Sequence, residues 1–90
     1  MPGDNWTEGA LWHEKGEYML GRIRYCLTRM EEPSGFVHDV GAFVLQEESC
    51  PVHTGLVQLR TPEGRTWLVR ILRISRPHRD GEFEVIEPVA

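Results

Sequence analysis

The sequence lacks the features that mark several large classes of protein. None of its apolar runs approaches the roughly 18 residues that a membrane-spanning helix needs. The N-terminal stretch MPGDNWTEGALW is acidic and has no basic segment followed by an apolar one, so no secretory signal is expected. Only two cysteines occur, Cys26 and Cys50, and in a reducing compartment they are expected to be free thiols. These absences predict a cytoplasmic protein without disulfides.

Enzyme signatures are missing as well. The chain has no glycine-rich phosphate loop, no dinucleotide-binding glycine pattern, no HExxH motif and no nucleophile elbow. Its three serines have no local catalytic context. His38 and Asp39 form a pair of a kind found in metal sites, but such sites need further histidine and aspartate ligands. We therefore predict a protein that is not an enzyme and that uses no cofactor.

One short stretch, CPVH, resembles half of a zinc site. Cys50 and His53 have the spacing of two zinc ligands, and a structural site needs four. The other half is absent as a motif, so Cys26, His13 or His38 would have to complete the site through the fold. The simpler interpretation is a proline-stiffened loop with a packed thiol. We predict no bound metal and keep a small structural-zinc domain as an alternative.

Charge is distributed unevenly along the chain. The net charge of −4 argues against nonspecific nucleic-acid binding as the main function, because affinity for DNA begins with phosphate neutralisation. Residues 51–79 nevertheless hold six arginines and a single acid, Glu63. In RILRISRPHR, residues 70–79, an arginine stands at every third position. The function of these arginines is the main question that the sequence raises.

The hydrophobic pattern predicts five strands. Period-two alternation of apolar residues and turn signals delimit them, and Gly21 indicates a bend or bulge in the first. A helix through residues 40–49 is an alternative for part of the second strand. The expected strands cover residues 18–29, 36–45, 55–60, 65–74 and 82–87.

The clearest local signal is a hairpin in GLVQLRTPEGRTWLVRIL. Pro62 suits the first central position of a type I turn, and Gly64 suits the left-handed position that closes a three-residue loop. Such a turn pairs Thr61 with Arg65, and it therefore sets two apolar pairs across the strands. The expected pairs are Leu59 with Trp67 and Val57 with Val69, and the expected core face is Val57, Leu59, Trp67, Val69 and Ile71.

These elements predict one mainly β domain over residues 1–90, a strongly bent antiparallel sheet or barrel. Residues 1–16 are expected to form an N-terminal arm or a short helix, with TEGALWHEKG as the helical segment, and residues 17–87 the β core. The domain resembles SH3-like and OB-like barrels in size and strand count only. An α+β sheet covered by one helix is the alternative.

Strict alternation along the 65–74 strand separates the arginines. Arg70 is expected on the outer face with Arg60, Arg73 on the opposite face, and Arg76 and Arg79 in the turn that follows Pro77. A return of the last strand could place Glu84 opposite Arg73. The tail's glutamates, Glu82 and Glu84, could thus neutralise the arginines instead of leaving them free for a partner.

Together these patterns favour a small, non-enzymatic, cytoplasmic protein-binding module of the adaptor or inhibitor type. It would bind a protein partner, for which an acidic surface is the first candidate, through a sheet edge with arginine and tryptophan anchors. Nucleic-acid binding by the 60–79 ribbon is the alternative, self-association through sheet edges is a further one, and no membrane contact is expected. The candidate partner-binding residues are Trp6, Arg60, Arg70, Arg73, Arg76 and Arg79.

Overall fold

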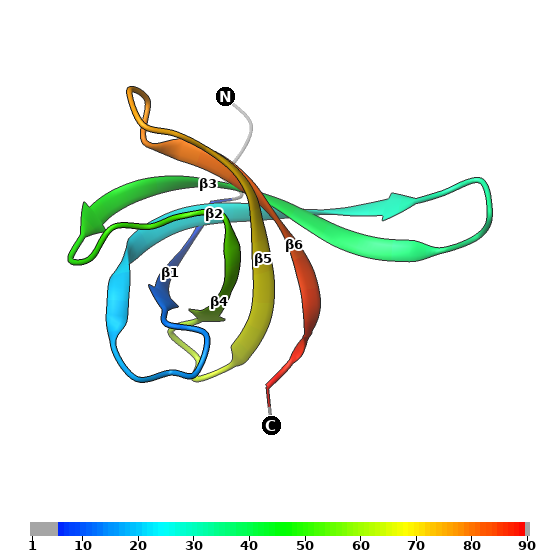
Figure 1. Ribbon diagram of the computed structural model, residues 1–90. Helices are drawn as coiled ribbons and strands as arrows, with labels where there is room; N and C mark the ends of the chain where they lie inside the picture. The colour runs from blue at the N-terminus through cyan, green and yellow to red at the C-terminus, as the bar shows by residue number, and fades with distance from the viewer. Residues whose placement is uncertain (1–5, 90) are drawn as a thin grey trace.

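Six antiparallel strands close into a barrel in the computed structural model, which describes residues 6–89 (Figure 1). In space they follow the order β1-β2-β3-β6-β5-β4, so two three-stranded meanders join through β3 with β6 and β1 with β4. The small β barrel expected from the sequence is confirmed, with one strand more than expected. The described residues include no helix that is long and apolar enough to cross a membrane. The strands are β1 Thr7–Trp12, β2 Met19–Glu31, β3 Val37–Glu48, β4 Gly55–Arg60, β5 Thr66–Ser75 and β6 Asp80–Pro88.

The additional strand lies where the sequence suggested a helix. The expectation of a helix over residues 7–16 was wrong, because Thr7–Trp12 is strand β1. It pairs with β2 on one side and β4 on the other, for example Leu11 with Gly21 and with Leu59. A helix this short has little stability of its own, whereas two neighbouring strands satisfy the backbone of β1 and bury Leu11 to 1% exposure. The α+β alternative therefore does not hold for residues 6–89.

The predicted hairpin is confirmed in register. Leu59 pairs with Trp67 and Val57 with Val69, as the turn residues required. The Thr61 amide donates to the Arg65 carbonyl at 2.9 Å, and Gly64 adopts a φ of +92°. The strand expected over residues 36–45 is also confirmed, and the helix alternative over residues 40–49 is wrong, because β3 runs from Val37 to Glu48.

A reciprocal pair of contacts joins the two meanders where β3 meets β6. Phe43 lies opposite Gly81, and Phe83 lies opposite Gly41. Both phenylalanines are buried to 1% exposure or less, and their ring centroids are 6.1 Å apart. Each ring occupies the space above the glycine that faces it, so neither glycine has room for a side chain. We call these four residues the phenylalanine–glycine seam.

The β2–β3 hairpin extends beyond the rest of the barrel. The pairing of β2 with β1 begins at Tyr25, and the pairing of β3 with β6 begins at Val40, so neither neighbour follows the hairpin farther. Residues 27–39 therefore project as a two-stranded ribbon, seen at the right of Figure 1, and are called the arm. At its tip the Glu32 amide donates to the Phe36 carbonyl at 2.8 Å, and Gly35 takes a φ of +92°.

Candidate functional site

A bulge in β5 changes the arrangement of the arginines. The register passes from Ile71 opposite Phe83 directly to Arg73 opposite Glu82, which leaves Leu72 as the additional residue. An additional residue shifts the alternation of faces by one position. Arg70 and Arg73 therefore lie on the same outer face, and the expectation that they lie on opposite faces was wrong.

The glutamates of β6 form ion pairs with both of these arginines. Arg70 Nη1 lies 2.9 Å from Glu84 Oε1, and Arg73 Nε lies 3.2 Å from Glu82 Oε1. The expected pairing of Glu84 with Arg73 was wrong, since Glu84 is the partner of Arg70. Exposed pairs of this kind contribute about 0 to 1 kcal/mol each, so their main effect is to balance the charge of this face.

Arg60 packs on the protein's own Trp12. Its guanidinium carbon lies 4.0 Å from the centre of the Trp12 ring, and its Nη2 donates to Gln58 Oε1 at 3.3 Å. Gln58 is itself 8% exposed and donates to the Glu14 carbonyl at 3.0 Å. This network places Arg60 where β1 pairs with β4 and closes the barrel. Trp6, at 39% exposure, lies immediately before β1.

The two remaining candidate arginines lie in the β5–β6 turn. Arg79 has a left-handed φ of 57°, and its carbonyl accepts the Leu45 amide at 2.6 Å. Arg76 donates to both Glu48 carboxylate oxygens, at 2.9 and 2.7 Å, and to the Val52 carbonyl. The six candidate residues thus do not form one cluster, and Arg60, Arg70, Arg73 and Arg76 have partners within the protein.

Glu48 and Arg76 form a latch over the loop that contains Cys50 and His53. Glu48 Oε2 also accepts the Val52 amide at 2.7 Å, and the Val52 side chain is fully buried. The hydrogen bond from Arg76, followed by that from the Val52 amide, lowers the pKa of Glu48 below its ordinary value of 4.5. Cys50 is half-buried and His53 is exposed. Residues 6–89 contain no group of three or more histidine, cysteine or acidic side chains that could hold a metal ion.

This latch is expected to make the stability of the protein depend on pH. Because the folded state lowers the pKa of Glu48, its contribution is complete above the unfolded value and is lost as the pH falls through the folded value. Glu48→Gln should therefore reduce the free energy of unfolding by about 1 kcal/mol at pH 7, and the difference from wild type should vanish at low pH. Urea titrations of the wild type and the variant at several pH values between 7 and 2 measure the difference in the free energy of unfolding. A difference that persists unchanged at pH 2 would contradict the assignment.

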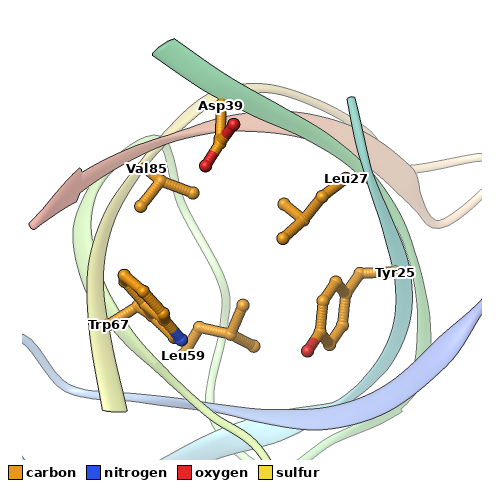
Figure 2. A pocket seen from close by; sticks show the side chains of 6 residues that line it. All are labelled: Tyr25, Leu27, Asp39, Leu59, Trp67 and Val85. Carbon is orange, nitrogen blue, oxygen red and sulfur yellow. The ribbon is translucent and has the colours of Figure 1, made fainter. Parts of the chain in front are cut away.

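A small pocket opens at the end of the barrel where the arm begins. Six side chains from five strands point toward one another there (Figure 2): Tyr25, Leu27, Asp39, Leu59, Trp67 and Val85. Its lining is mainly apolar, with the Asp39 carboxylate at the rim beside the guanidinium of Arg29, 3.4 Å away. The free volume is about 40 Å³, far below the several hundred Å³ of typical small-molecule sites. We call this space the mouth pocket.

A wider, more polar hollow lies next to the mouth pocket. It shares Tyr25, Leu27 and Trp67 with the pocket and adds Thr7 and residues of the 61–65 turn. Burial, followed by the negative charge of Glu63, raises the pKa of Tyr25 above its ordinary value of 10.0. Tyr25 therefore keeps its proton at neutral pH and can donate a hydrogen bond at this end of the barrel.

Sequence reasoning missed the arm and the mouth pocket. Trp67, Leu59 and Val85 were all assigned to strands, but which end of the barrel would open depends on where neighbouring strands stop pairing. One signal lies in strand length: β2 has 13 residues and its neighbour β1 has 6, and β3 has 12 residues and its neighbour β6 has 9. A hairpin whose strands are longer than their outer neighbours extends beyond them.

No family model, curated protein or solved structure matches this chain. The geometry offers little support for nucleic-acid binding by the 60–79 ribbon, because three of its arginines are ion-paired and Trp67 lines the barrel interior.

Proposed function

We propose that the protein is a non-enzymatic protein-binding module that contacts its partner through the arm and the adjoining mouth of the barrel. The observation that carries this proposal is the exposed apolar surface of the arm. Phe36 is 58% exposed, Leu27 50%, Met30 47% and Val37 45%. Leu27 and Val37 lie on one face of the ribbon and Met30 lies on the other, so apolar side chains are exposed on both faces of the arm. Aromatic and methionine side chains are enriched at protein interfaces.

The backbone of the arm supports the same proposal. A closed barrel leaves few strand edges unpaired, and the arm carries two of them because β1 and β6 do not follow it. A two-stranded ribbon is marginally stable alone in water, so a partner that covers it would also stabilise it. These unpaired edges support the arm as the site of the sheet-edge binding that the sequence led us to expect. Cytoplasmic action remains part of the proposal, and both cysteines are free, as a reducing compartment requires.

Affinity capture from lysate with mass spectrometry tests the proposal. The variant Met30→Ser/Phe36→Ser should lose at least about 90% of any partner that wild type captures, because the loss of two anchors typically weakens binding by more than 1.4 kcal/mol. Leu56→Ser serves as the matched control, since Leu56 is an exposed leucine on β4, away from the arm. Equal capture by all three proteins would reject the arm as the contact surface.

A charge-reversal variant tests the arginine anchors separately. Arg70→Glu/Arg73→Glu should leave partner capture within about twofold of wild type, because both side chains are ion-paired to the protein's own glutamates. The melting temperature is measured in parallel to exclude unfolding. Loss of capture by a folded variant would instead restore Arg70 and Arg73 as partner contacts.

A further inference from the structure

We propose that the partner binds as an extended strand in the fork between β3 and β6, with a branched aliphatic side chain in the mouth pocket. This inference rests on the proposed function and specifies the chemistry of the partner. The last pair between the two strands is Val40 with Glu84. Beyond it β3 continues into the arm while β6 continues toward the C-terminus, and the two diverge (Figure 1).

The fork presents rows of main-chain amides and carbonyls. Only another extended backbone can form hydrogen bonds to consecutive groups in such a row. On the side of the fork, the described chain provides no strand partner for residues 37–39 of β3 or for residues 85–88 of β6. On its other side, β6 is still paired with β5, for example Val85 with Val69, so this edge is held in extended form. A strand edge that is held open in this way is the standard acceptor for strand addition. Pro88 has no amide to donate, which confines the pairing on β6 to residues 85–87.

The mouth pocket lies inside this fork and defines the side chain that it accepts. Leu27 and Asp39 line it from the arm, and Val85 and Trp67 line it from the other side of the fork (Figure 2). A strand added there would direct alternate side chains into the barrel. About 40 Å³ of free volume holds two or three waters, which corresponds to a group such as isopropyl.

Charge at the rim adds a second preference. The Asp39 carboxylate is 37% exposed and forms an ion pair with Arg29, whose side chain is 75% exposed and therefore easily displaced. A lysine or arginine two positions from the aliphatic residue, on the same face of the added strand, would gain this carboxylate. The expected partner segment is thus an extended stretch with Val or Ile and a basic residue two positions away. This preference differs from the acidic partner that the arginines alone suggested.

Selection of a displayed library of random 12-residue peptides on the wild-type protein tests the inference. Selected peptides should share a branched aliphatic residue with a Lys or Arg two positions away. Leu27→Arg should weaken their binding at least tenfold, and Asp39→Asn should weaken it several-fold. Leu56→Arg should leave it unchanged, because Leu56 is an exposed leucine on β4 that does not line the pocket. Hydrogen exchange with bound peptide should slow at the amides of residues 37–39 or 85–87.

Three results of the peptide experiment would overturn the inference. They are the absence of any selected peptide, peptides that bind Leu27→Arg as well as wild type, and bound peptides that protect neither edge of the fork. Sedimentation that shows a dimer of the free protein, abolished by Leu27→Arg, would assign the fork to a second copy and would also overturn it. In each of these cases the proposed function would stand if capture from lysate still depended on Met30 and Phe36. The two proposals can therefore fail separately.

Discussion

Gly81→Ala should be among the most damaging single substitutions in this protein, with a loss of about 3 kcal/mol or more in the free energy of unfolding. A β-carbon at this position would lie 2.2 Å from the Arg73 carbonyl oxygen and 2.7 Å from the Phe43 ring. The nearest of these atoms belongs to the backbone, so no side-chain rotation relieves the contact. The β5–β6 ladder would have to separate where Ile74 pairs with Gly81. Urea unfolding measures the loss, and the melting temperature should fall by about 12 to 24 °C.

Gly35→Ala provides the matched control for this substitution. Gly35 has a φ of +92°, and no atom lies within 4 Å of a β-carbon built there. Only the unfavourable backbone conformation then contributes, at about 1 to 2 kcal/mol. A Gly81→Ala protein that is as stable as Gly35→Ala would show that the backbones of β5 and β6 are not as close as described.

Gly41→Ala should have the second largest effect, about 2 to 3 kcal/mol, and unlike Gly81→Ala it should be rescued. The three atoms nearest to its β-carbon, at 2.3, 2.6 and 2.8 Å, all belong to the Phe83 ring. Trimming that ring removes the clash, so Gly41→Ala/Phe83→Leu should be more stable than the sum of the two single losses. We expect a coupling free energy of about 1 to 2 kcal/mol in a double-mutant cycle.

The other half of the seam gives the contrasting cycle. Combining Gly81→Ala with Phe43→Leu should leave the two losses close to additive, because the Arg73 carbonyl still blocks the new β-carbon. Additive losses in the Gly41 cycle, or strong coupling in the Gly81 cycle, would contradict the description of the phenylalanine–glycine seam.

Local chemistry made part of this fold predictable. Pro62 and Gly64 define a turn with one geometry, and this turn fixes the register of every residue between Leu56 and Arg70. The buried face of that hairpin follows from the register alone. Strand β1 was not predictable in this way, because its six residues have no strong preference and are held by β2 and β4, which come later in the chain.

The bulge at Leu72 shows where strict alternation misleads. Alternation from Ile71 would place Arg73, a charged residue, on the core face, and Ile74 on the outer face. The bulge reverses both placements: Arg73 pairs with Glu82 outside, and Ile74 packs against the core. An arginine assigned to the core was itself a reason to expect an additional residue. The fork is harder to predict, since it depends on the relative lengths of strands that are distant in sequence.

The two joins between the meanders also bear on how fast the barrel can form. Four of its six strand pairs link consecutive strands, while β1 with β4 and β3 with β6 connect segments roughly half the chain apart. Loop-closure entropy makes such distant pairings slow. The phenylalanine–glycine seam lies in one of them, so its rings can pack only when both meanders are already present. We therefore expect the rate-limiting step of folding to be the docking of the two meanders, during which the phenylalanine–glycine seam packs.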